Sequence, residues 1–264
     1  MFPLSDDNPR IKFPVATVAL LALIAASWLL IQGAGFDPVR LAISVCNLGM
    51  VPGELTRQAA MGSGVPIGPG MACVVDAEPI NLATPITSMF LHGSWAHLLG
   101  NSLFLWVFGD NVEESMGTAR FVLFYLVCGL VAAAAHVLMQ PGSPVPTVGA
   151  SGAISGVMGA YLLLYPRARV NMLFIFVIIF RVIPVPAWLV LLWWFLVQVL
   201  TGLPELMRLR PEVSGGVAVW AHVGGFVAGL ALVKLFANPR LVAVRRAAWL
   251  ERRRLVRPAP DRPW

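Results

Sequence analysis

Charged side chains are scarce in this sequence. Asp, Glu, Lys and Arg make up 12% of the 264 residues, whereas a soluble domain carries roughly 25%. Hydrophobic residues make up 58%, and the mean hydropathy is +0.78. This composition excludes a disordered chain and argues against an ordinary cytosolic enzyme. The sequence therefore predicts a polytopic membrane protein that is built from helices.

Cysteines and metal-binding motifs are also scarce. The three cysteines form no C-x-x-C pair, and the sequence contains no H-E-x-x-H motif. These absences exclude a disulfide scaffold and argue against a zinc protease, so we expect neither a cofactor nor a metal. Cys46 and Cys73 share one predicted loop, where a disulfide and two free thiols are equally compatible with the sequence. Cys128 is expected to be a packing residue inside a helix.

Six apolar stretches approach the roughly 20 residues that cross about 30 Å of hydrocarbon. The first follows Arg10 and Lys12 and has no small-x-small cleavage site, so we interpret it as a retained span and not as a signal peptide. The predicted fold class is an all-α bundle of six transmembrane helices. The expected spans are 14–32, 96–112, 119–139, 151–165, 187–202 and 217–236.

The segment 170–183 is apolar but too short to span, because Arg181 interrupts it and Pro184 ends it. We expect an interfacial or re-entrant piece that packs against the cytoplasmic side of the bundle. The predicted organisation is a cytoplasmic segment 1–13, a membrane domain 14–236 with a long outer loop 33–95, and a basic cytoplasmic tail 237–264. Further outer connectors are expected at 140–149 and 204–216.

Basic residues gather on one predicted side of the membrane. With six spans and both termini inside, 15 of the 19 Lys and Arg are cytoplasmic, as the positive-inside rule requires. The net charge of +6 is therefore interpreted as a topology signal. Because the basic tail follows a span directly, we expect it to contact anionic lipid and not nucleic acid. The expected location is a bacterial cytoplasmic (inner) membrane.

Polar residues inside the spans are few, and each is a functional candidate because polarity is costly in a bilayer. At about 1.5 Å per residue from the inner helix ends, Ser151 and His222 lie about 21 and 18 Å up. His97 and Asn101 are four residues apart on one helix face, and they lie about 20 and 14 Å up by the same measure. Three helices that are distant in sequence therefore place four polar side chains at nearly one depth.

Each of these residues also has an ordinary structural interpretation. A lone serine usually bonds to its own helix, and a lone histidine or asparagine usually bonds to a neighbouring helix. The functional interpretation gains support from small residues, G-x-x-x-G at 152–156 and A-x-x-x-G-x-x-x-G at 221–229. Such stripes allow two helices to approach closely, as a hydrogen bond of about 3 Å between Ser151 and His222 requires.

The chemistry that suits this set is acyl transfer. Ser151 would be the nucleophile and His222 the base that takes its proton. No carboxylate lies at this depth, so the pair would be a dyad. Backbone N–H groups at the start of the helix, together with His97 and Asn101, would form an oxyanion hole. Ser155, one turn below Ser151, is the alternative nucleophile.

The sequence around these positions resembles the rhomboid intramembrane serine proteases over residues 84–235. The matching pieces are HGSWAHLLGN (92–101), FGDNVE (108–113), GASG (149–152) and AHVGG (221–225), in the order and spacing of the family. The resemblance implies a six-helix core with a Ser151–His222 dyad in a water-filled cavity, and His97 and Asn101 as oxyanion donors. It also implies cleavage of transmembrane segments of other membrane proteins near their outer ends.

The resemblance carries two further implications and two departures. It gives Glu113 a structural role, and it gives span 187–202, with its tryptophans, and the outer connectors the role of gating substrate access. Many members have a tyrosine four residues after the nucleophile, which packs on the catalytic histidine, but here that residue is Ser155. The Trp-Arg pair of the first outer loop is absent, since Arg57 has no tryptophan before it.

The sequence thus predicts an intramembrane serine endopeptidase whose partners are transmembrane protein substrates. One rival is a non-catalytic rhomboid-like protein that binds membrane-protein clients, although such relatives usually lose the serine or the histidine. A second rival is a solute channel or transporter, whose expected charged residue in the middle of the membrane is missing.

Overall fold

The structure is a computed structural model that describes residues 2–77, 79–176, 179–206 and 218–256. Most of the expected connector at 204–216 and the first residue of the span expected at 217–236 lie outside the described residues. The end of the predicted basic tail, residues 257–264, also lies outside them.

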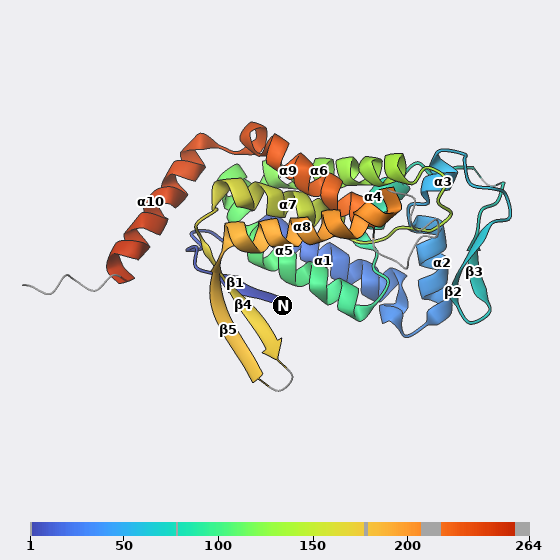
Figure 1. The fold of residues 1–264 in the computed structure, drawn as a ribbon, viewed down its shortest axis with the longest axis horizontal. Coiled ribbons are helices and arrows are strands. Elements are labelled where there is room, and N and C mark those ends of the chain that lie inside the picture. Colours follow the sequence, from blue (N-terminus) through green and yellow to red (C-terminus); the bar gives the residue numbers. More distant parts are fainter. Residues whose placement is uncertain (1, 78, 177–178, 207–217, 257–264) are drawn as a thin grey trace, which may run out of the picture.

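Helices dominate the fold, and α5 to α9 run along the long axis of the molecule (Figure 1). Each of the six predicted apolar stretches forms a helix. By length and composition, α6, α9 and residues Ala187–Pro204 of α8 can cross a membrane; the count of six spans stays a prediction. The main helices are α1 (Val15–Ala26), continued by the π-helical turn η1 (Ser27–Ile31), α5 (Trp95–Met116), α6 (Thr118–Met139), α7 (Ser151–Leu164), α8 (Ala187–Leu206), α9 (Val219–Phe236) and α10 (Pro239–Val256).

Local sequence sets the ends of the helices that carry the polar candidates. The Ser94 hydroxyl oxygen accepts a hydrogen bond of 3.2 Å from the His97 backbone N–H and caps α5. Gly117 separates α5 from α6 with a φ of +85°, a conformation that glycine adopts at little cost. Gly149, with a φ of +129°, turns the chain just before α7 begins at Ser151.

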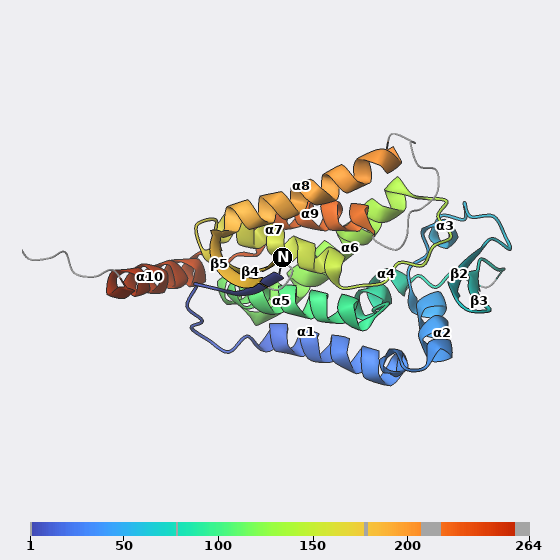
Figure 2. The same ribbon diagram turned by 60° about the horizontal axis from the view of Figure 1, so that its bottom comes forward.

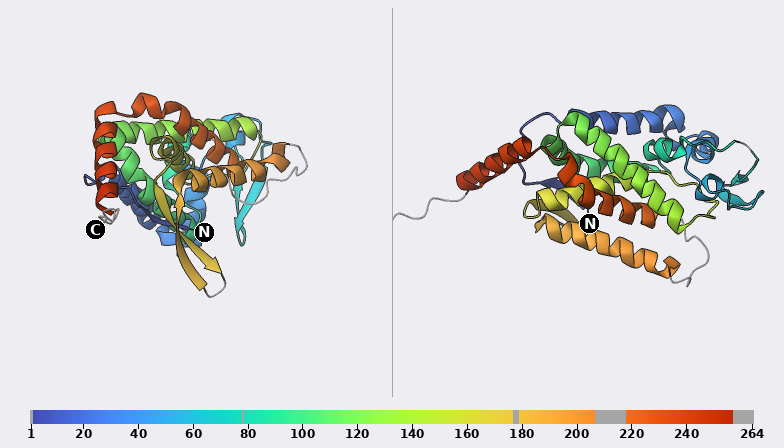
Figure 3. Two further views of the ribbon diagram at one scale, coloured as in Figure 1. Left: turned by 60° about the vertical axis from the view of Figure 1, so that its left-hand side comes forward. Right: turned by 90° about the horizontal axis from the view of Figure 1, so that it is seen from above.

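Helix α7 lies at the centre of the bundle, where it contacts α5, α6, α8 and α9. Figures 2 and 3 show α1 and α8 on opposite sides of this central helix. A methyl group at Gly225 would lie 2.0 Å from the Gly152 carbonyl oxygen, and one at Gly229 would lie 1.9 Å from the Gly156 carbonyl oxygen. The predicted close approach of these two helices is therefore confirmed, and it depends on residues without a side chain.

The all-α prediction is wrong in one respect, because short strands accompany the helices. Strands β4 (Arg169–Phe176) and β5 (Ile179–Pro186) form an antiparallel hairpin, and β1 (Phe2–Asp6) pairs with β4. The predicted interfacial segment is thus a sheet. Its base packs on the core through Val170 and Met172, whereas Phe180 of β5 is 65% exposed. The hairpin of β4 and β5 projects from the bundle (Figure 1). The β-branched residues of this run suit a strand. The run is too short to span a membrane as a helix, and pairing between strands gives its backbone N–H and C=O groups hydrogen-bond partners.

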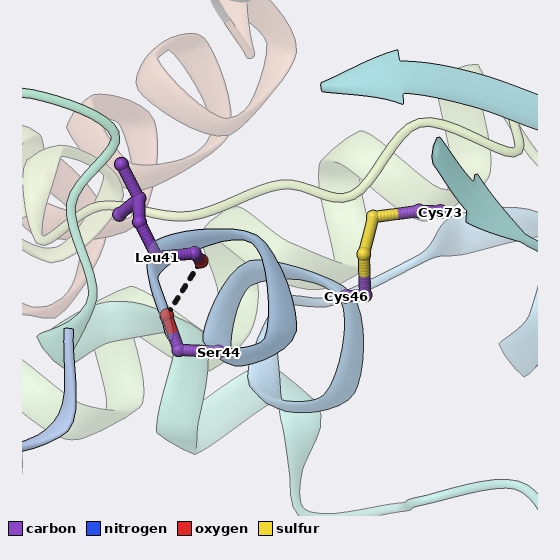
Figure 4. The surroundings of a disulfide bond; sticks show 4 residues. All are labelled: Leu41, Ser44, Cys46 and Cys73. Atoms are coloured by element: carbon purple, nitrogen blue, oxygen red, sulfur yellow. Dashed lines mark hydrogen bonds between the residues drawn. A yellow bond between two sulfur atoms is a disulfide. The ribbon is translucent and has the colours of Figure 1, made fainter. Parts of the chain in front are cut away.

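The segment 33–95, which the sequence predicts to be a long outer loop, is folded. It contains α2 (Pro38–Leu48), α3 (Pro52–Leu55) and α4 (Thr84–Thr87), the hairpin β2 (Gly64–Gly68) and β3 (Met71–Val74), and the 3-10 turns η2 (Gly33–Gly35) and η3 (Ser88–Phe90). Helix α2 begins where Asp37 accepts hydrogen bonds from two backbone N–H groups ahead of Pro38 at the first helical position. A disulfide joins Cys46 of α2 to Cys73 of β3 (Figure 4), which decides the alternative left open by the sequence. Cys128 is free and buried.

The end of the bundle near β1 is held by charged groups. The Glu113 carboxylate accepts hydrogen bonds of 2.8 Å from the backbone N–H groups of Ala16 and Thr17 and from the Thr17 hydroxyl. Glu113 thereby binds the start of α1 to the end of α5, which is a structural role. Arg245 of α10 is buried, pairs with Glu114 and donates to the Tyr165 hydroxyl at 2.8 Å. At least this residue of the basic tail packs on the bundle, while lipid contact by the rest stays a prediction.

Candidate active site

A cavity of about 610 Å³ lies between α5, α6, α7 and α9, and Trp194 of α8 contributes to its lining. All four residues that the sequence predicted line it, namely His97, Asn101, Ser151 and His222. They come from three helices that are separated in sequence. Their meeting at one cavity agrees with the similar depths that were estimated from the sequence. The structure therefore brings the complete predicted set to one cavity.

Ser151 and His222 form a hydrogen-bonded pair. The Ser151 Oγ lies 2.7 Å from the His222 Nε2, which is the distance at which a base can take a proton from a hydroxyl. Ser151 is the first residue of α7, and His222 lies in the first turn of α9. The close contact of the two helices through their glycines sets this distance.

The other two predicted residues present hydrogen-bond donors beside the serine. A methyl group at Gly149 would lie 2.7 Å from the His97 Nε2 and 3.6 Å from the Asn101 Nδ2, so both nitrogens face the backbone that leads into Ser151. The His97 Nδ1 accepts a hydrogen bond of 3.4 Å from the Gly93 N–H, which leaves the ring hydrogen on Nε2. The Asn101 Nδ2 is buried and has no hydrogen-bond partner among the described residues. Both side chains can therefore donate to a ligand in the cavity.

Two residues of α8 also contact the pair, and they were not among the predicted site residues. The Gln198 Oε1 lies 2.8 Å from the His222 Nδ1, and the Trp194 ring centroid lies 5.7 Å from that of His222. Gln198 is a polar residue within an apolar span, so the rule that found the other candidates would have found it too. Trp194 was singled out only as part of a gate.

Two further polar side chains in the helices, Ser155 and His136, have structural partners. The Ser155 hydroxyl donates to the Ser151 carbonyl oxygen at 2.6 Å, the ordinary bond of a serine inside a helix. The His136 Nε2 lies 3.0 Å from the Thr147 hydroxyl. His92 differs, because its hydrogen bonds are made by its backbone, whose N–H donates to the Gln32 side chain at 2.8 Å; its two ring nitrogens are buried without a hydrogen-bond partner among the described residues, and its ring centroid lies 5.0 Å from that of His97. Across the described ranges, no group of three or more His, Cys, Asp or Glu side chains is arranged to hold a metal ion.

The structure thus combines an apolar helical bundle with a hydrogen-bonded serine–histidine pair at a cavity between the helices. Residues 81–239 match the Rhomboid domain. Because that match covers more than half of the sequence, the chain belongs to the rhomboid family and is an integral membrane protein.

Named relatives agree with this assignment. The rhomboid protease GluP of Bacillus subtilis (strain 168) is 43% identical over 89 residues, which cover 34% of this chain and 16% of GluP. The rhomboid protein YdcA of the same strain is 33% identical over 152 residues, which cover 57% of this chain and 62% of YdcA. The mitochondrial Rhomboid protein 1 of Saccharomyces cerevisiae is 33% identical over 113 residues, which cover 40% of this chain and 30% of the yeast protein. The chain thus spans less than two thirds of the length of each of these relatives.

Proposed function

We propose that this protein is an intramembrane serine endopeptidase that hydrolyses peptide bonds in transmembrane segments of other membrane proteins. The observation that carries the proposal is the 2.7 Å contact between the Ser151 Oγ and the His222 Nε2 at a cavity of about 610 Å³. The name of GluP as a rhomboid protease supports the same activity.

The first half of the reaction follows from this contact. The Ser151 oxygen attacks the carbonyl carbon of the scissile bond while His222 takes the hydroxyl proton on Nε2. The bond to the amide nitrogen then breaks, and His222 returns the proton to the leaving amine. In the second half, His222 takes a proton from water, which attacks the acyl-serine, and the regenerated Ser151 hydroxyl receives that proton.

The negative oxygen of the tetrahedral intermediate is stabilised by neutral donors. The Asn101 Nδ2 and the His97 Nε2 supply side-chain donors, and the first backbone N–H groups of α7 have no acceptor within the helix. The positive end of the α7 dipole acts in the same direction. Removing one donor of this kind typically costs about 100- to 1000-fold in kcat.

The proposed setting is a six-span membrane domain with both termini in the cytoplasm. The support for it is the distribution of Lys and Arg along the sequence. A bacterial inner membrane, and contact of the exposed tail arginines with anionic lipid, belong to the same proposal.

The test uses the full chain, purified in detergent and returned to liposomes, with a model transmembrane substrate. Wild type is compared with Ser151→Ala and His222→Ala, and Ser155→Ala is the matched control on the same helix. We expect cleavage by wild type and Ser155→Ala and none by the two dyad variants. Cleavage that persists in Ser151→Ala would refute the nucleophile. Binding of the substrate by wild type without cleavage would instead support the client-binding alternative.

A further inference from the structure

The base of the dyad has a partner on each of its ring nitrogens. His222 Nε2 faces the Ser151 hydroxyl at 2.7 Å, and His222 Nδ1 faces the Gln198 Oε1 at 2.8 Å. Gln198 belongs to α8, whereas the dyad residues belong to α7 and α9. The three side chains therefore form a chain of hydrogen bonds across three helices.

The amide oxygen of Gln198 fixes which ring nitrogen carries the hydrogen. An amide oxygen only accepts, so the His222 Nδ1 must donate to it, and in a neutral imidazole Nε2 then has the free lone pair. That lone pair is what the Ser151 proton requires. In the opposite tautomer Nε2–H would face the serine, and the ring could not act as its base.

Gln198 is the hydrogen-bond partner that the structure places on the Nδ1 side of the His222 ring. His222 is half-buried beside the Trp194 ring at 5.7 Å, and Trp194 lies four residues before Gln198 on the same face of α8. The titratable side chains that line the same cavity are His97 and His222. An amide supplies the acceptor without the cost of a carboxylate in the membrane.

We propose that Gln198 is a positioning residue that holds His222 in the tautomer and orientation needed for general-base catalysis. The inference rests on the proposed function, since it concerns the base of that dyad.

The position of Gln198 also ties the base to a peripheral helix. Of residues 187–204 in α8, 17% are buried, compared with 44% in the corresponding part of α6 and 39% in that of α9. A displacement of α8 away from α9 therefore breaks the bond to Nδ1 before it disturbs the packing of α7 on α9. The competence of the base depends on where α8 lies.

The experiment compares Gln198→Leu, Gln198→Glu and a control, Thr201→Val, in the full chain. Thr201 lies on α8 and its hydroxyl donates to the Val197 carbonyl oxygen at 2.7 Å, so the control removes a hydrogen bond that does not involve the base. Two rates are measured, namely cleavage of a transmembrane substrate and phosphonylation of Ser151 by a small fluorophosphonate. The small probe reports on activation of the serine without the passage of a helix past α8.

For Gln198→Leu we expect kcat and the phosphonylation rate to fall together, by about 10- to 100-fold, with KM within about twofold of wild type. Gln198→Glu again offers Nδ1 an acceptor, so it should recover most of the phosphonylation rate. A carboxylate favours the protonated ring, so the acid limb of its pH–rate profile should move to higher pH. Thr201→Val should match wild type.

The results that would overturn this inference differ from the result that would overturn the proposed function. Phosphonylation of Gln198→Leu at the wild-type rate, with only substrate cleavage altered, would make Gln198 a gate residue. Equal loss in the Leu and Glu variants with an unchanged pH profile would make its role purely structural. Wild type that is neither phosphonylated nor active would refute the proposed function itself, whereas labelling that requires His222 but not Gln198 would refute this inference alone.

Discussion

The contact between α7 and α9 can be tested by adding one methyl group, in Gly229→Ala. The new Cβ would lie 1.9 Å from the Gly156 carbonyl oxygen, although ordinary contacts of this kind begin at 3.4 Å. The shortfall of about 1.5 Å faces a backbone atom, so the helices must separate or bend. Overpacking of this kind costs about 1–3 kcal/mol, and a loss of about 2 kcal/mol lowers Tm by about 4–8 °C in a chain of this size.

The same displacement should reach the dyad. The Ser151–His222 contact of 2.7 Å joins the two helices that must separate, and a hydrogen bond weakens steeply as its atoms move apart. We therefore expect Gly229→Ala to lower both Tm and the rate of Ser151 phosphonylation in detergent. Val227→Ala is the control on the same helix, because the Val227 side chain is 49% exposed and its truncation adds no atom to the contact between α7 and α9. A Gly229→Ala protein as stable and as readily labelled as this control would refute the assigned contact.

Further predictions concern parts of the structure outside the cavity. Glu113→Gln should lower the free energy of unfolding by about 1–3 kcal/mol, measured by thermal unfolding, because an amide has one acceptor oxygen where four donors converge. Burial raises the pKa of Asp6 from 3.8 to about 7, so the folded state binds this proton more tightly than the unfolded chain. The resulting stabilisation of the folded state is at most about 4 kcal/mol, is complete below about pH 4, and is lost as the pH rises through 7. In Asp6→Asn the free energy of unfolding, measured between pH 5 and 8, should therefore depend less on pH than in wild type. Reduction of the Cys46–Cys73 disulfide should speed tryptic cleavage after the exposed Arg57, because about 3.5 kcal/mol of loop-closure entropy no longer restrains the segment; cleavage at an equal rate in both redox states would contradict this.

The helices and the contact between Ser151 and His222 could be predicted because each left a strong signal in the sequence. Long apolar runs identify helices through length alone. Ser151 and His222 stood out because polar residues are rare in such runs, and the glycine spacing showed which helices meet. The rare polar residues and the regular spacing of the glycines were therefore enough to predict which helices meet and at which residues.

The hairpin of β4 and β5 left no comparable signal. A short apolar run rich in Val, Ile and Phe is ambiguous between a buried helix and a strand, and its partner β1 lies more than 160 residues away in the register Asp6↔Val170. Arg245 illustrates the same limit. Its position in a basic tail suggested lipid, but its ion pair with Glu114 depends on where α10 meets the end of α5.

The distribution of charge within the bundle explains why the site uses neutral groups. Along α7, Tyr161 lies ten residues from Ser151, about 15 Å at 1.5 Å per residue, and it donates a hydrogen bond to Asp6. Charged groups thus gather at the end of α7 that is remote from the cavity, where they hold the helices together. At the cavity a carboxylate would be costly, so His222 has an amide behind it and no counter-charge. An amide can orient the ring but does little to stabilise its protonated form, so the rate should depend more on geometry than in a triad with an aspartate. Small displacements of a helix, such as that imposed by Gly229→Ala, should therefore reduce Ser151 reactivity by a larger factor than their effect on stability alone would suggest.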